Sequence, residues 1–182
     1  MAYPDYPDLE RIAFPVDDED EHPSGGHCAS LLGESRVETW QSILNQHRQA
    51  LDVLVEAATR DSDAWALTRP VLFAAHHVCE LAMKVAFVRH AGLAQEPPRT
   101  HDLLQIWKTL RRKNAVEHLP QVEVTNSEAF LNQMNSLTPD GITARYPLSD
   151  PSDVGSRWCC LNSTNLNMAV TAFTARLEHR GT

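Results

Sequence analysis

The stretch HHVCELAMKVAFVRHAGLAQEPPRTHDLLQIW, residues 76–107, decides the fold. Its first part is almost continuously apolar, a turn containing glycine and proline follows, and Thr100-His101-Asp102 opens a second amphipathic segment. Glu80 and Lys84 interrupt the apolar part, and polar groups in so apolar a helix must be paired, functional or at the rim of a packed face. The stretch therefore predicts two consecutive helices, the first of which forms the centre of a bundle.

Apolar residues recur at three- and four-residue steps along most of the remaining chain, which is the spacing of helices with one buried face. Ser35 and Glu38 form a capping box, Gly92 suits a helix end, and Thr100 suits a helix start. The pattern predicts helices at Arg36–Thr59, Pro70–His90, His101–Lys113 and Ser127–Leu137, a short turn of helix at Ala64–Leu67, and a last helix starting between Ser152 and Ser156. We expect an all-α, up-and-down bundle of about five helices.

The negative charge of the chain is concentrated at its N-terminus. Residues 1–30 contain eight acidic residues and one basic residue, whereas the rest contains 16 acidic and 15 basic residues. The first 33 residues also hold four prolines and Ser24-Gly25-Gly26, a composition that cannot bury enough apolar surface to offset its ordering entropy. We expect two parts: a flexible, disordered acidic tail at 1–33 and a nearly neutral helical bundle at 34–180, which can accept an anionic partner.

Cysteine spacing and the absence of a targeting pattern limit the class of protein. Cys28, Cys79, Cys159 and Cys160 do not have the spacing of a metal site, so we expect no metal and no other cofactor. The N-terminal segment lacks the basic and apolar regions of a signal peptide, and no apolar run approaches the roughly 20 residues of a membrane helix. We expect a cytoplasmic protein with no membrane partner.

Four residues around the central stretch are candidates for binding an anion. Lys84 lies four residues after Glu80, a spacing that favours an ion pair on one helix and a structural role for both. His101 precedes Asp102 at a helix start, where a hydrogen bond that fixes the fold and a chemical role both remain open. Arg99 and Arg145 each lie beside a turn. We predict that Lys84, Arg99, His101 and Arg145 form a binding site for the phosphate of a nucleotide or RNA.

Three segments, ELAMKVAF (80–87), THDLLQIW (100–107) and ARYPLSD (144–150), follow one another before the last predicted helix. In this order and spacing they resemble the HEPN family, the higher eukaryotes and prokaryotes nucleotide-binding domain, over about residues 36–178. The resemblance implies a bundle of four to five helices that dimerises. It also implies a role in a bacterial toxin–antitoxin or phage-defence system, where a protein partner such as an antitoxin is expected.

The resemblance also implies a possible activity, because active HEPN proteins are ribonucleases that need no metal. They share a motif in which four to six residues separate an arginine from a histidine. In that chemistry the histidine acts as general acid and base, and the arginine stabilises charge on the phosphate. Arg112 and His118 match the motif with five residues between them. They follow the third predicted helix, however, whereas the family motif lies on or just before the last one.

Three interpretations of function follow. The first is a HEPN-like bundle that binds RNA or a nucleotide and lacks catalysis. The second is a metal-independent endoribonuclease that uses Arg112 and His118. The third is a non-enzymatic bundle whose apolar face binds another protein.

Overall fold

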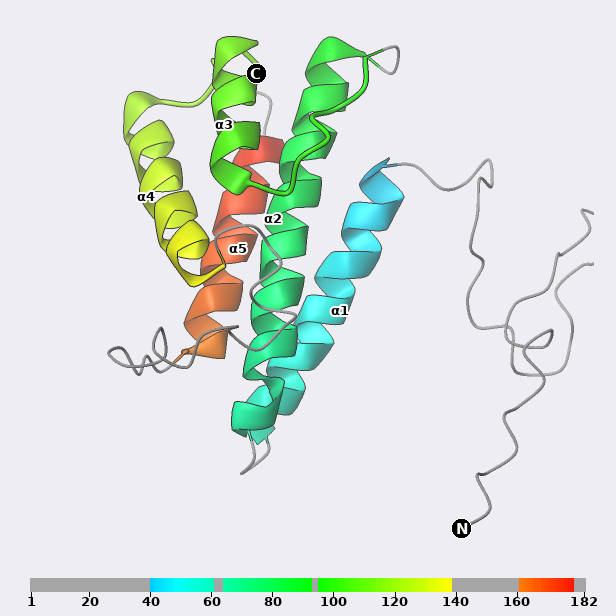
Figure 1. Ribbon diagram of the computed structural model, residues 1–182, viewed down its shortest axis with the longest axis vertical. Helices are drawn as coiled ribbons and strands as arrows, with labels where there is room; N and C mark the ends of the chain where they lie inside the picture. The colour runs from blue at the N-terminus through cyan, green and yellow to red at the C-terminus, as the bar shows by residue number, and fades with distance from the viewer. Residues whose placement is uncertain (1–39, 61–63, 93–94, 139–160, 179–182) are drawn as a thin grey trace, which may run out of the picture. The chain divides into compact units, whose positions relative to one another are not determined.

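The computed structural model describes residues 40–60, 64–92, 95–138 and 161–178. The chain divides into two units, Met1–Ser35 and Arg36–Thr182, and all of the described residues belong to the second. The elements are α1 (Trp40–Arg60), a 3-10 turn η2 (Ala64–Leu67), α2 (Thr68–Ala91), α3 (Leu103–Arg112), α4 (Gln121–Leu137) and α5 (Ser163–Glu178). Figure 1 shows them as a helical bundle, and no strand occurs in these ranges. The predicted all-α bundle is confirmed.

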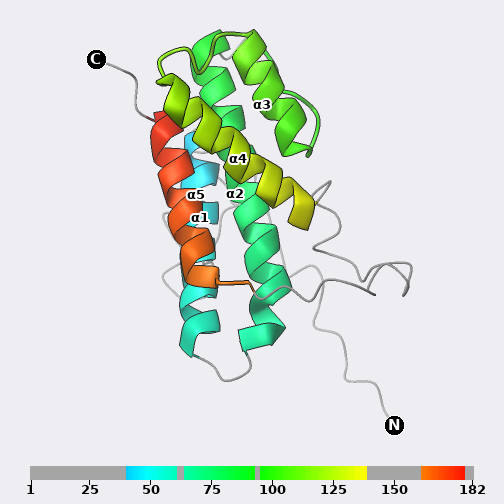
Figure 2. The same cartoon turned by 90° about the vertical axis from the view of Figure 1, so that its left-hand side faces the viewer.

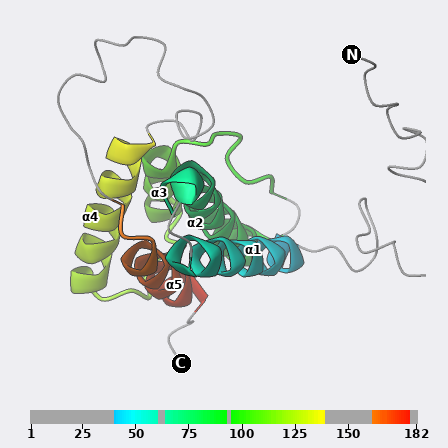
Figure 3. The same ribbon diagram turned by 90° about the horizontal axis from the view of Figure 1, so that it is seen from below.

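The centre of the bundle is α2, as the sequence predicted. All residues from Val78 to Val88 are buried, so this helix has a core-facing surface on every side over three turns. It contacts α1, α3 and α5, while α4 packs on α3 and α5. Seen from below, α1 and α4 accordingly lie on opposite sides of the bundle (Figure 3). Burial of apolar side chains, at about 25 cal/mol per Å², is the main stabilising term.

By length and composition alone, α2 is also apolar enough to cross a membrane, so the expectation that no segment approaches this limit is wrong. In the bundle, 78% of its most apolar 18-residue window is buried. That burial identifies α2 as the core helix of the bundle. A helix whose central turns are buried on every side needs no polar face there, which explains why its composition resembles that of a membrane span.

The connection between α2 and α3 determines which polar groups meet. As predicted, Gly92 ends α2, whose last residue is Ala91. The backbone φ of Gly92 is 81°, and its amide donates a hydrogen bond to the Val88 carbonyl at 2.8 Å. The chain then returns along α2, and His101 reaches the level of His76 and Glu80, to both of which it is hydrogen-bonded. From there α3 runs in the same direction as α2 (Figures 1 and 2). The returning segment is thereby held against the second half of α2.

One predicted feature of α3, its N-cap, needs correction. Its N-cap is Asp102 rather than Thr100, because the Asp102 carboxylate accepts hydrogen bonds from the amides of Leu104 and Gln105 at 2.8 and 3.1 Å. The Thr100 hydroxyl instead accepts the Asp102 amide. At the other end Asn114 adopts a φ of 59°, and the Ala115 amide bonds to the Leu110 carbonyl, which closes the helix as a Schellman motif.

The start of α4 was predicted too late. It begins at Gln121 rather than Ser127, because the Pro120 carbonyl accepts the amides of Glu123 and Val124. Pro120 is the N-cap residue, with φ of −56° and ψ of 148°, and lies just outside the helix.

The last helix was predicted too early. Residues 152–156 lie outside the described ranges, but Leu161 and Asn162 are not helical, and the helix starts at Ser163. The Asn162 side chain accepts a hydrogen bond from the Asn165 amide at 3.0 Å and so caps the start of α5. The predicted capping box of Ser35 and Glu38 also falls outside the described residues.

Candidate anion-binding site

A buried carboxylate, Glu80, lies at the centre of the polar groups on α2. It is 3% exposed. Its Oε1 accepts a hydrogen bond from Lys84 Nζ at 2.7 Å, and His101 Nδ1 lies 3.1 Å from both carboxylate oxygens. His77 Nδ1 lies 3.7 Å from Oε2, within ion-pair distance. The i, i+4 pair that the sequence predicted therefore exists, and it is extended by a residue from the returning segment.

Two opposing effects determine the ionisation of Glu80. Burial raises the pKa of its carboxyl, but the hydrogen bonds with His77, Lys84 and His101 and the charge of Lys84 outweigh burial and hold that pKa at about 2. The carboxylate is therefore charged at neutral pH. A charge at this depth is stable only because donors surround it.

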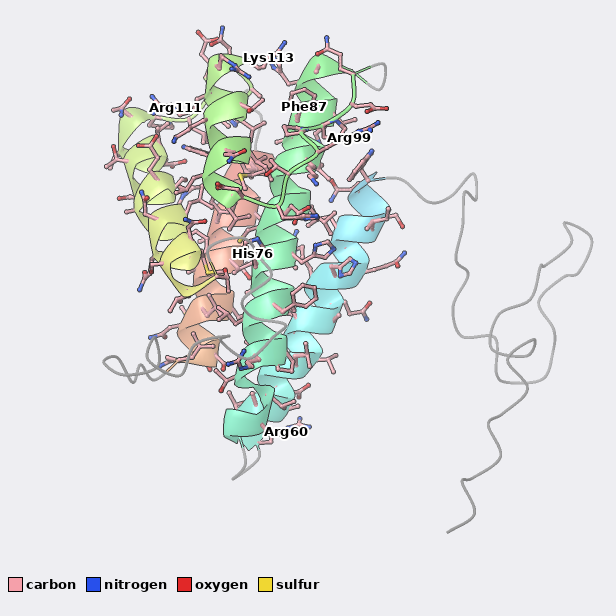
Figure 4. All side chains as sticks on the ribbon, in the orientation of Figure 1. Arg60, His76, Phe87, Arg99, Arg111 and Lys113 are labelled. Carbon is pink, nitrogen blue, oxygen red and sulfur yellow. The ribbon has the colours of Figure 1, made fainter. Side chains whose placement is uncertain are left out.

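A second buried polar group, His76, fixes the start of the returning segment. Its Nε2 lies 2.9 Å from the His101 carbonyl oxygen, and its Nδ1 lies 2.8 Å from the Thr138 hydroxyl at the end of α4. A carbonyl only accepts, so Nε2 carries the proton. Burial is the main cause that lowers the pKa of His76, which favours the neutral ring. The Thr138 hydroxyl that lies beside Nδ1 also donates to the Met134 carbonyl at 3.0 Å. His76, halfway along α2 in Figure 4, thus joins three segments.

A pair of histidines, His47 and His77, extends these polar groups toward α1. The rings of His47 and His77 meet edge to face, with centroids 4.5 Å apart. Burial lowers the pKa of His47, and the neighbouring His77 lowers it further. The pair is half-buried and sits at the contact between α1 and α2.

A cavity of about 350 Å³ opens where the start of α1, the end of α2 and the returning segment meet. Lys84 lies at its inner wall with 11% of its side chain exposed, and Arg99 lies at its rim with 84% exposed. Apolar groups supply much of the remaining wall: Trp40, Val88, Pro97 and Pro98. Figure 4 shows Arg99 beside the upper part of α2. The cavity therefore combines two cations with an apolar and aromatic wall.

Glu96 also lines this cavity, and its carboxylate accepts two hydrogen bonds from the Arg99 guanidinium at 2.6 and 3.0 Å. Both side chains are largely exposed, so this ion pair contributes little, on the order of 0 to 1 kcal/mol. Arg99 can exchange Glu96 for an incoming anion at small cost.

The four predicted binding residues are only partly brought together. Lys84 and Arg99 line one cavity, and His101 is joined to Lys84 through Glu80. Arg145 lies outside the described residues. Sequence reasoning did not select Trp40, the first residue of α1, or His76, whose partners come from distant segments. Within the described ranges no cluster of three potential ligands could hold a metal ion.

The ribonuclease candidates lie elsewhere in the bundle. Arg112 is the last residue of α3 and is exposed; His118 is exposed in the segment between α3 and α4. The His118 Nε2 lies 3.5 Å from the Arg176 carbonyl oxygen on α5. Neighbouring Arg111 is paired with Glu128, which also accepts the indole N–H of Trp107 and so ties α3 to α4. Figure 4 shows Arg111 and Lys113 at the end of α3.

A model of the HEPN domain matches residues 47–165, which is more than half of the chain. The chain belongs to the HEPN family. The match includes α2, the returning segment, α3 and α4, and therefore the whole Glu80 network and most of the cavity lining. Membership indicates a function related to nucleotides or RNA. Comparisons with curated proteins and with solved structures gave no match.

Replacing the buried carboxylate tests its structural contribution. Glu80→Gln leaves the Lys84 ammonium buried without its counter-charge, so we expect a loss of about 3 kcal/mol in the free energy of unfolding. Urea denaturation measures it. Lys84→Met in the same chain should recover part of the loss, and the exposed control Glu96→Gln should cost less than about 1 kcal/mol. Equal effects of the two glutamate replacements would contradict this account.

The stability of the bundle should fall with acidification in two steps. His76 and His47 have pKa values below the 6.5 of an unfolded histidine, so the unfolded chain takes up protons first and stability declines below about pH 6.5. Glu80 stabilises the fold above its unfolded pKa of 4.5, and this contribution disappears as the pH falls toward its folded pKa of about 2. Urea denaturation measures the free energy of unfolding at each pH. In His76→Gln this free energy should fall less between about pH 6.5 and 4.5 than in the unmodified chain. An equal fall in both proteins would show that His76 does not cause the upper step.

Cleavage of RNA by the Arg112–His118 pair has a direct test. Should the purified chain cleave RNA through this motif, His118→Ala lowers the cleavage rate by about 100-fold or more, since a general acid–base group contributes that much. A labelled single-stranded RNA and gel analysis measure the rate, and His90→Ala, an exposed histidine on α2, is the matched control. Unchanged cleavage and unchanged cell toxicity would exclude His118.

Proposed function

We propose that this HEPN chain binds a nucleotide or RNA through the cavity lined by Lys84 and Arg99, and that this binding does not depend on catalysis. The observation that carries the proposal is the joining of two cations to an apolar, aromatic wall in one cavity of about 350 Å³. Cavities of roughly 300–1,000 Å³ with a few convergent polar groups are typical of small-molecule sites.

Each part of the cavity suits one part of a nucleotide. The Arg99 guanidinium offers paired N–H donors that match phosphate oxygens, and Lys84 supplies a point charge at the inner wall. Trp40 provides a ring on which a base can stack, which is worth about 1–3 kcal/mol. In this proposal Arg145 supplies a third cation, and His101 acts through Glu80.

The wider setting is proposed from the family. The protein acts in the cytoplasm as a homodimer, in a bacterial defence or toxin–antitoxin system, and a protein such as an antitoxin is its partner. Support comes from HEPN membership over residues 47–165 and from the burial of α2 inside the bundle. Cleavage of RNA by Arg112 and His118 and a purely protein-binding role stay predictions from the sequence.

Replacement of the cavity cations tests the binding site. Lys84→Met and Arg99→Ala should each weaken binding of adenosine monophosphate or a short single-stranded RNA by about tenfold, because each removes a charged hydrogen bond worth about 1.5 kcal/mol. Isothermal titration calorimetry at constant salt measures the Kd, and adding Arg145→Ala should weaken it further.

Arg60→Ala is the control, since Arg60 is an exposed cation at the opposite end of α1 from the cavity (Figure 4). If Arg60→Ala weakens binding as much as Arg99→Ala does, the contribution is general charge attraction and the cavity is not the site.

A further inference from the structure

Lys84 and His101 share one carboxylate. Glu80 Oε1 accepts Lys84 Nζ at 2.7 Å and lies 3.1 Å from His101 Nδ1, which also lies 3.1 Å from Oε2. The carboxylate can only accept, so Nδ1 of His101 carries a proton in either charge state of the ring, and the ring gains its charge at Nε2. With 61% of its side chain exposed, His101 exchanges protons with solvent, while Glu80 and Lys84 are buried.

The surroundings of this carboxylate contain few other charges. On α2 they are His76, His77 and Lys84; on α1, His47 approaches only through His77; on the returning segment there is His101. Asp102 next to it caps α3, and Arg99 is paired with Glu96. No other acidic group contacts Glu80 within the described ranges. The charge at Glu80 is therefore balanced by Lys84 and by histidines.

The charge presented to the cavity then depends on His101. With His101 neutral, Lys84 and Glu80 cancel, and the inner wall of the cavity is close to electrically neutral. With His101 protonated, the same three side chains carry a net positive charge. The Glu80 carboxylate then interacts with two cations, and it neutralises less of the Lys84 charge than before. Glu80 and Lys84 are buried, whereas the His101 ring that carries the added charge is largely exposed, so solvent screens part of its effect at the cavity.

We propose that Glu80 and His101 form a proton-dependent control of the cavity, in which protonation of His101 strengthens the binding of a phosphate anion at Lys84. The proposal rests on the proposed function of the cavity and adds its regulation. Histidine is the side chain suited to such control, because its charge changes within the physiological range of pH. The exposed ring senses pH, and the buried carboxylate transmits its charge to the cavity wall.

The test uses uridylyl-uridine, whose phosphodiester keeps a single charge throughout the range examined. Its Kd for the full chain is measured by calorimetry at constant salt, between about pH 8 and about pH 5.5. We expect the Kd of the unmodified chain to fall about fivefold on acidification, as a partly screened unit charge would produce. Circular dichroism at each pH confirms that the helices remain folded.

Two variants locate the effect. His101→Asn places an amide donor near the position of Nδ1 but cannot be protonated, so its Kd should change by less than about twofold over the same range. His77→Asn removes the other histidine within ion-pair distance of Glu80 and should keep the dependence. Loss of the dependence in His77→Asn alone, or its persistence in His101→Asn, overturns the proposal.

The two proposals fail in different ways. Binding of uridylyl-uridine with a Kd that does not vary with pH overturns the control by His101 and leaves the cavity as the binding site. No binding of uridylyl-uridine, adenosine monophosphate or single-stranded RNA at any pH overturns the proposed function and the control with it.

Discussion

The carboxylate of Glu80 is the constraint on which the rest of this bundle depends. A charged group that is 3% exposed must be surrounded by donors, and α2 supplies only Lys84 and, more distantly, His77. The remaining donor, His101, comes from a segment that has to fold back along α2 to reach it. His76 fixes the same segment by bonding to the His101 carbonyl. Satisfying the buried charge thus determines the path between α2 and α3.

That path also creates the cavity. Because the chain returns along α2 before α3 begins, residues 95–99 lie against Lys84 and Val88 and meet the first residue of α1. If α3 had followed α2 through a short antiparallel turn, a helix would pack against this part of α2 in place of residues 95–99. Fold stability and the proposed function therefore use the same side chains: Lys84 partners a buried carboxylate and lines a cavity, and His101 holds the returning segment while facing solvent.

Helix positions were largely predictable because they follow from local patterns. Apolar spacing located α1 to α4, Gly92 marked the end of α2, and the distance of four residues between Glu80 and Lys84 predicted their ion pair. The errors arose where two local signals compete. Thr100 and Asp102 are both good caps, and only the backbone geometry selects Asp102. The start of α4 was missed because Pro120 caps it through its backbone carbonyl, without a side-chain cap that the sequence would show.

By itself the sequence determined an all-helical chain, its most buried helix and its resemblance to the HEPN family, since propensity, periodicity and motif order are properties of neighbouring residues. Tertiary structure alone decided that Arg99 and Trp40, 59 positions apart, line one cavity with Lys84. It likewise decided that His101 shares Glu80 with Lys84, and that His76 bonds to two distant segments. The physical reason is that the partners of a buried polar group are chosen by the folded path of the chain, and no local spacing records that path.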